Sequence, residues 1–312
     1  MILAKDFIET VEGLVFAVVE SGLEKDKVLC FLRYIKQGRA WKKVNTEQAN
    51  QYLSKKYPHY LYYSPVKQAH CHALTLAQVY KRHQPQERVK QLLESGGGDI
   101  IEKDCIALCL LFQQHDLDLA LLGVTGSILI SAQKTTSDID LVFYSRDVFN
   151  QARAITKKLI EQGKCSQLSE KDWLESYDRR QGDLSYKEYV WHEKRKFNKA
   201  MINQRKFDLS LVNVDNTEQN IDLIEYKKLE AIVLKVQVVG DSFTFDYPAK
   251  FIIDHSEIKS IVCYTATYTG QAKAGEWIEV SGVVEQATEG DKRIVVGSSR
   301  EACGEYIKVI NA

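Results

Sequence analysis

The chain has 312 residues, of which 45% are hydrophobic and 27% charged, and its 42 lysines and arginines balance 42 aspartates and glutamates. This length predicts two or three domains, and the composition is ordinary for a soluble globular protein. The zero net charge excludes a bulk attraction to nucleic acid, so any such attraction must come from local patches.

The cysteines and the hydropathy pattern predict a cellular location. Seven cysteines are scattered without a C-x-x-C pair, and the sequence opens without a signal peptide, which predicts reduced thiols and a cytoplasmic protein. No apolar run approaches the roughly 20 residues needed to cross a bilayer, so no membrane partner is expected.

The first predicted module, residues 1–95, combines β-rich and helical segments. Asn45 is expected to cap a helix, with Gln48 reaching back to it. The run Ser95–Gly98 reads as a linker, and the first domain boundary is placed there. The expected strands lie within 6–19 and 28–35, and the expected helices within 45–57, 74–82 and 86–94.

A strand, a turn and a second strand form the centre of the next module, predicted to cover residues 96–238. An apolar strand at 119–125 leads into the turn Gly126–Ser127 and a short helix from Ser127 to Ala132. Such a turn offers backbone N–H groups and a hydroxyl to an anion. Helices are also predicted over 100–114 and 146–162, and the alternation of strands and helices predicts a compact mixed core.

Two acids follow the turn in the motif Asp138-Ile139-Asp140. Alternate residues of a strand face the same way, so Asp138 and Asp140 are expected to present two carboxylates to one point, with Ile139 turned into the core. Mg²⁺ prefers oxygen ligands and is usually held by one or two carboxylates together with substrate phosphates. The sequence therefore predicts a magnesium site, or a manganese site, beside a phosphate cradle.

These motifs resemble the nucleotidyltransferase superfamily that includes DNA polymerase beta, whose members carry a G-S turn, a D-x-D pair and a third carboxylate on a later strand. The third carboxylate in this chain is expected to be Asp208, on the alternating segment 206–212. Many small members place a glycine four residues after the serine, where this chain has Ser131. The resemblance covers about residues 99–234 and implies two-metal nucleotidyl transfer.

A basic and aromatic stretch lies between the two acidic motifs, at residues 178–206. Such a stretch can place cations against phosphates and rings against bases. A cation must oppose the triphosphate tail, and Lys134, Arg195 and Lys199 are the candidates. Half-burial of an amphipathic helix is the competing interpretation.

The last module, residues 239–312, is predicted to be a small all-β barrel or sandwich. Five short β segments separated by glycine-bearing turns support this prediction. They are expected within 243–253, 258–269, 277–285, 293–297 and 306–310.

The whole chain also resembles a family of archaeal-type predicted nucleotidyltransferases, in which β-rich modules flank the catalytic one. The resemblance lies in Glu9–Leu14, Phe31–Tyr34, Gly123–Ser127 and Ser299–Ala302. The expected fold is therefore α+β, with a polymerase-beta-like core between an N-terminal β-rich module and a C-terminal all-β module.

The expected reaction transfers a nucleoside monophosphate from a nucleoside triphosphate to a hydroxyl acceptor and releases pyrophosphate. Asp138, Asp140 and Asp208 are expected to hold the metal and carry the chemistry, while Gly126 and Ser127 contact the phosphates. An RNA or tRNA end, a protein hydroxyl and a small molecule all stay open as acceptors. The alternative is a catalytically silent nucleotide- or RNA-binding protein that kept the fold.

Overall fold

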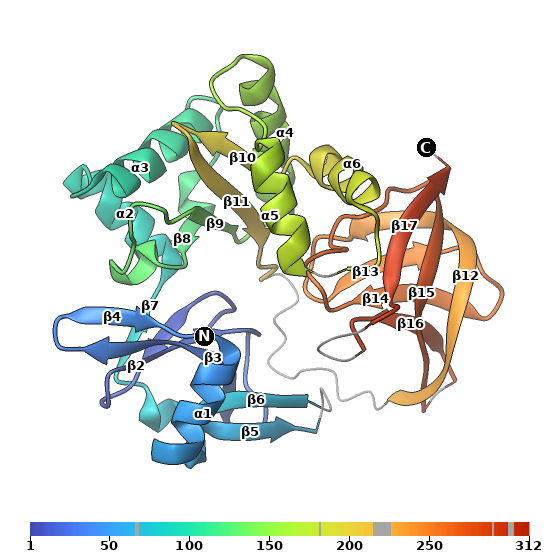
Figure 1. Cartoon of the computed structure of the whole chain (residues 1–312), viewed down its shortest axis with the longest axis horizontal. Coiled ribbons are helices and arrows are strands. Elements are labelled where there is room, and N and C mark those ends of the chain that lie inside the picture. Colours follow the sequence, from blue (N-terminus) through green and yellow to red (C-terminus); the bar gives the residue numbers. More distant parts are fainter. Residues whose placement is uncertain (66–68, 181, 215–225, 289, 299–302, 312) are drawn as a thin grey trace. The chain divides into compact units, whose positions relative to one another are not determined.

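The computed structural model describes residues 1–65, 69–180, 182–214, 226–288, 290–298 and 303–311 (Figure 1). These residues form an α+β protein with six α-helices and three β-sheets. Within these ranges, every helix is too short or too polar to cross a membrane. The stretch Ser299–Ala302, which contributed to the family resemblance, lies outside the described residues.

The described residues group into two compact units. The first contains the chain up to Lys158 together with residues 201–214, and the second contains residues 159–200 and those from 226 onward. The predicted boundaries at residues 95 and 238 divide the chain differently. The N-terminal module and the strands of the D-x-D motif belong to one unit, because helical and β segments from both pack on each other.

The first unit begins with a seven-stranded sheet in the order β5-β6-β3-β2-β1-β7, with β4 paired to β3 (Figure 1). One face of this sheet packs on helix α1, through a core that includes Phe16, Leu32 and Leu53. The predicted capping box of Asn45 and Gln48 is confirmed at the start of α1. The elements are β1 (Phe7–Glu9), β2 (Leu14–Val18), β3 (Lys27–Gln37), β4 (Ala40–Lys43), α1 (Thr46–Lys56), β5 (Leu61–Ser64), β6 (Ala69–Thr75) and β7 (Lys81–His83).

The helix predicted over residues 74–82 is wrong. Leu74 lies near the end of strand β6, where it pairs with Val28 of β3, and Lys81–His83 forms β7, which pairs with β1. A short 3-10 turn, Leu76–Gln78, joins the two strands. Local apolar spacing suggested a helix, but pairing with strands distant in the sequence decides the conformation of this segment.

A mixed four-stranded sheet in the order β10-β11-β9-β8 carries both acidic motifs. Strand β9 pairs antiparallel with β8 and parallel with β11. The elements are β8 (Leu122–Thr125), β9 (Ile139–Phe143), β10 (Lys199–Ile202) and β11 (Arg205–Leu211). One face of the sheet is apolar, with Phe143 packed edge-on against Phe112 and Phe149 of two helices.

Three helices support this sheet: α2 (Pro85–Ser95), α3 (Ile100–Gln113) and α4 (Arg146–Glu161). Helix α2 approaches β8 so closely that a side chain at Gly123 would overlap the backbone of Pro85 and Gln86. The glycine run predicted as a linker is a tight connection between α2 and α3, since Gly96 is the left-handed C-cap of α2 and Asp99 caps α3.

The second unit contains helices α5 (Glu170–Arg180) and α6 (Tyr186–Lys196) and a six-stranded sheet, drawn in orange and red in Figure 1. The strand order is β12-β13-β14-β16-β15-β17. The five predicted β segments overlap strands β13 to β17, whereas β12 was not predicted, since it meets the first predicted segment only at Phe243. The strands are β12 (Tyr226–Phe243), β13 (Ala249–Ile253), β14 (Ile258–Cys263), β15 (Trp277–Ala287), β16 (Lys292–Val296) and β17 (Tyr306–Asn311).

Candidate active site

Three polar residues form a row across neighbouring strands of the four-stranded sheet. Asp140 of β9 is in register with Asp208 of β11 on one side and with Thr125 of β8 on the other. Partners in register present their side chains on the same face, and neighbouring strands lie about 4.8 Å apart. The structure therefore brings Asp208 beside Asp140, although 67 residues separate them in the sequence.

Asp138 lies two residues before Asp140, at the entrance to β9, and its side chain is exposed. Residues two apart on an extended chain face the same way, so Asp138 belongs to the face that carries Asp140 and Asp208. Asp140 and Asp208 thus share one face of one sheet, which Asp138 directly precedes, and the helices that cover Phe143 lie on the other face.

The charges of the two neighbouring acids act on Asp140. Burial, the charge of Asp208 and the charge of Asp138 raise the pKa of Asp140 to about 6 from an ordinary 3.8, against the attraction of Lys5 and Lys43. Crowded carboxylates disfavour each other's ionised form, and a bound cation would remove that penalty. The row is therefore an anionic site at which a bound cation would be favourable.

The glycine of the predicted turn lies directly against this row. Gly126 has φ +69°, and a Cβ atom built on it would overlap the carboxylate oxygen of Asp140. Only glycine meets both conditions without strain, since L side chains rarely adopt this backbone conformation. The G-S turn and the D-x-D motif are thus parts of one constellation.

Ser127 follows with helical backbone angles and a half-buried side chain. The helix predicted from Ser127 to Ala132 is shorter than expected: it is one 3-10 turn, Ile128–Ile130, ended by Ser131 at φ +53°. Ser131, which stands where many superfamily members have glycine, thus has a left-handed backbone conformation. Glycine adopts that conformation more easily than serine. A single turn has little macrodipole, so an anion here would depend on the Ser127 hydroxyl and nearby amides.

Helix α2 holds this turn through one arginine. Arg88 donates to the carbonyl oxygen of Ile128 at 2.9 Å and to the hydroxyl of Ser131 at 3.0 Å, and it forms an ion pair with Glu102. Gln133 donates in turn to Glu102 at 3.0 Å. These bonds fix the loop that carries Ser127 to two helices.

A second arginine holds the segment that leads to Asp138. Arg205 of β11 donates to the carbonyl oxygens of Thr135 at 3.0 Å and Ser137 at 2.8 Å, while its Nε donates to Asp104 at 2.8 Å. Because Arg205 is three residues before Asp208, the same strand positions two of the three carboxylates.

Two of the three predicted cations are bound to acids of the second unit. Arg195 forms an ion pair with Glu276, and Lys199 forms one with Glu193. Although burial alone would raise it, Lys196, Lys199 and Arg180 together lower the pKa of Glu193 to about 2. Arg195, Lys196 and Lys199 of this stretch therefore stabilise the fold around α6. Lys134 lies exposed in the turn before Asp138.

The cations that act on Asp140 were missed by the sequence reasoning. Lys5 and Lys43 both belong to the N-terminal module, and Thr125 donates its hydroxyl proton to the carbonyl oxygen of Lys5 at 2.8 Å. The sequence feature that could have pointed to Lys43 is the cluster of positive charge around it, since residues 33–43 contain five cations and no acid.

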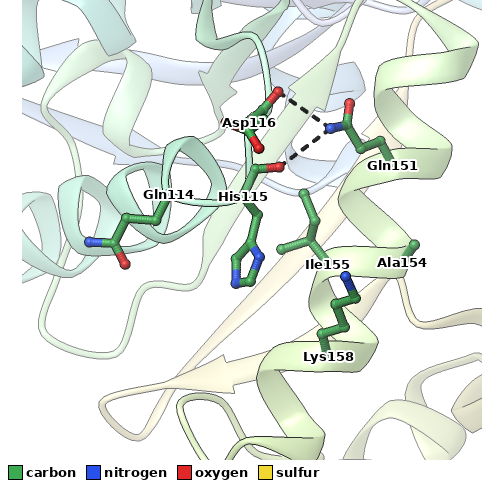
Figure 2. A pocket seen from close by; sticks show the side chains of 7 residues that line it. All are labelled: Gln114, His115, Asp116, Gln151, Ala154, Ile155 and Lys158. Carbon is green, nitrogen blue, oxygen red and sulfur yellow. Dashed lines mark hydrogen bonds between the residues drawn. The ribbon is translucent and has the colours of Figure 1, made fainter.

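The carboxylate row is not a complete metal cage, and the pocket in Figure 2 contains none of its residues. Among the residues that the structure describes, no three His, Cys, Asp or Glu side chains form a metal-ligand group. The pocket lies between the end of α3 and helix α4, where Gln151 donates to the carbonyl oxygens of His115 and Asp116 (Figure 2). It is lined by Gln114, His115, Asp116, Gln151, Ala154, Ile155 and Lys158.

The comparisons with known proteins give one relative. No family model matches the chain, and no solved structure matches it. The chain is 34% identical to a protein of Methanocaldococcus jannaschii named "Uncharacterized protein MJ1086", in an alignment that covers 98% of each chain. Identity at this level over nearly the full length shows common descent, and the chain belongs to the family of MJ1086.

Proposed function

We propose that this protein is a metal-dependent nucleotidyltransferase whose polymerase-beta-like core is the sheet β10-β11-β9-β8. It transfers a nucleoside monophosphate from a nucleoside triphosphate to a hydroxyl acceptor and releases pyrophosphate. The observation that carries the proposal is the in-register pair of Asp140 and Asp208, with the backbone of Gly126 against the Asp140 carboxylate.

The donor chemistry of the site fits a divalent cation. Asp138, Asp140 and Asp208 offer only oxygen atoms, which suit Mg²⁺ and Mn²⁺. Because magnesium at phosphate sites keeps waters and binds substrate oxygens, a closed protein cage is not required. When bound, such ions polarise the phosphoryl group and neutralise the leaving pyrophosphate.

The chain's own residues have separable roles in this proposal. Asp138 and Asp140 would hold a cation, and Asp208 would hold a second cation or take the proton of the acceptor hydroxyl. Gly126 lets the backbone of the turn approach the Asp140 carboxylate, and the hydroxyl of Ser127 donates to a phosphate oxygen. Arg88 positions the loop of Ser127 through the carbonyl oxygen of Ile128, and Arg205 positions the segment before Asp138 through the carbonyl oxygen of Ser137. Most of the rate then comes from positioning and charge neutralisation.

The test is pyrophosphate release from each nucleoside triphosphate with Mg²⁺ or Mn²⁺, together with transfer of a labelled α-phosphate. Asp208→Asn should lower the rate by about 10²-fold or more, because this residue is proposed to act on the reacting atoms. Asp26→Asn is the matched control, since Asp26 is exposed in a turn at φ +62°, where asparagine is equally tolerated.

An equal rate for Asp208→Asn and wild type would exclude Asp208 from catalysis. Nucleotide binding by the wild type without pyrophosphate release would identify a catalytically silent nucleotide-binding protein, which is the second function that the sequence left open.

Ser127→Ala should have a smaller effect than loss of a carboxylate. The variant removes one hydroxyl donor to the triphosphate, for which a loss of about tenfold to a thousandfold is expected. The turn should keep its shape, because the Ser127 side chain makes no capping bond. A fall in kcat/KM with an unchanged midpoint of unfolding would agree with this role, whereas an unchanged kcat/KM would remove Ser127 from the phosphate contacts.

A further inference from the structure

The hairpin formed by β3 and β4 concentrates positive charge in an otherwise neutral protein. We call residues Arg33–Lys43 the basic hairpin, since it contains five cations and no acid. The cations are Arg33, Lys36, Arg39, Lys42 and Lys43. Arg33 is half-buried and the other four are exposed.

These cations are not neutralised within the fold, although Lys36 lies over the Trp41 ring. In the described ranges none of the five forms a salt bridge with an acid, unlike Arg195 and Lys199 in the second unit. Strand β4 pairs with β3 at one side of the sheet, and lysines commonly protect such exposed strands from pairing with other chains. One or two charges would serve that purpose, so five within eleven residues require another explanation.

The basic hairpin packs on the turn of the candidate site. Tyr34 and Trp41 belong to the same apolar cluster as Leu129 and Ile130, which directly follow Ser127. Tyr34 is in register with Lys43, and Trp41 is in register with Lys36. Partners in register share a face. Lys36 and Lys43 therefore extend from the face that meets the turn, and Lys43 is one of the two cations that attract Asp140.

The length of the hairpin fits a polymeric ligand better than a single nucleotide. A strand rises about 3.3 Å per residue, so the cations from Arg33 to the turn at Arg39 extend over roughly 15 to 20 Å. That span exceeds one triphosphate and suits several successive phosphates of a chain.

We propose that the basic hairpin binds the phosphodiester backbone of a single-stranded nucleic acid and leads its terminal hydroxyl toward Asp208. The inference rests on the proposed function and adds the class of the acceptor. A single strand is favoured because its backbone is flexible enough to follow the hairpin into the carboxylate row.

Binding of fluorescently labelled 15-nucleotide oligouridylate and oligothymidylate to the full chain tests the proposal. The measurement is made by anisotropy in EDTA at several salt concentrations, so that it does not depend on catalysis. The variant Lys36→Gln, Arg39→Gln, Lys42→Gln spares Lys43 and the site. It should bind at least roughly tenfold more weakly, and the slope of log K against log salt should fall by about 2, since each lost phosphate contact on a single strand contributes about 0.7.

The matched control is Lys55→Gln, Lys56→Gln, Lys90→Gln, which removes the same charge from three exposed lysines of α1 and α2. It should bind like the wild type. The proposal would be overturned if both triple variants weakened binding equally or if the wild type bound neither oligonucleotide. It would also be overturned if the wild type bound polyglutamate more tightly than the oligonucleotides. Pyrophosphate release without oligonucleotide binding would support the transferase activity and refute nucleic-acid binding by the hairpin. Oligonucleotide binding without pyrophosphate release would support the binding and refute the transferase activity.

Discussion

Asp140→Asn is expected to abolish nucleotide transfer and to make the metal-free protein more stable at neutral pH. The carboxylate lies in the centre of the row and is proposed to hold the metal, so its loss should lower the rate by about 10⁴-fold or more. Its crowding and burial raise its pKa to about 6. Ionisation of Asp140 therefore opposes folding when no cation is bound.

The pH dependence follows from the direction of this shift. The folded protein holds the Asp140 proton more tightly than the unfolded chain, so stability is complete below an ordinary pKa of 3.8 and is lost as the pH rises through about 6. Two pKa units correspond to about 3 kcal/mol, which is the upper limit of the gain for Asp140→Asn at pH 7. Below pH 4 the variant and the wild type should unfold with the same free energy.

Urea unfolding in EDTA at pH 4 and pH 7 measures this difference, and the same experiment with Mg²⁺ tests the metal. Added Mg²⁺ should stabilise the wild type and have no effect on Asp140→Asn. Asp26→Asn again provides the control. The electrostatic account of the row would be contradicted if Asp140→Asn were less stable than the wild type at pH 7 in EDTA. It would also be contradicted if Mg²⁺ stabilised Asp140→Asn as much as the wild type.

Gly126→Ala should damage both the fold and the activity. The left-handed backbone conformation costs an alanine about 1–2 kcal/mol, and its Cβ atom would also collide with the Asp140 carboxylate. The expected loss is about 3 kcal/mol or more in the free energy of unfolding. Transfer should fall by about 10²-fold, because a displaced carboxylate no longer lies where the reaction needs it.

Gly163→Ala separates the two causes. Gly163 has φ +70° with nothing within 4 Å of its added Cβ, so this variant carries the backbone cost alone. In an Asp140→Ala background the collision is removed, and Gly126→Ala should then cost no more than Gly163→Ala, which is a non-additivity typical of contacting residues. If Gly126→Ala and Gly163→Ala are equally destabilising in the wild-type background, the close approach of Gly126 to Asp140 is refuted.

Local patterns predicted many elements of this protein well. The Asn45 capping box, helix α4 with its buried Phe149 and Leu159, and the alternation of β9 and β11 all depend on residues within a few positions of each other. In such segments hydrophobic period, capping and turn residues agree with the final structure.

Predictions that depended on distant partners succeeded less often. The segment 74–82 became strands because β3 and β1 were available for pairing. Arg195 and Lys199 were candidates for the triphosphate, but Glu276 and Glu193 neutralise them. The choice among partners separated by tens of residues is made by packing and desolvation, which leave no local trace in the sequence.

The sequence by itself determined which groups are present: a G-S turn, the pair Asp138 and Asp140, and an acid at position 208 on an alternating strand. Only the tertiary structure decided that Asp208 lies in register with Asp140, that Gly126 meets its carboxylate, and that Lys43 of the N-terminal module attracts it. The physical reason is that a strand's side-chain period is a local property, whereas register and charge proximity arise when segments from different parts of the chain pack together.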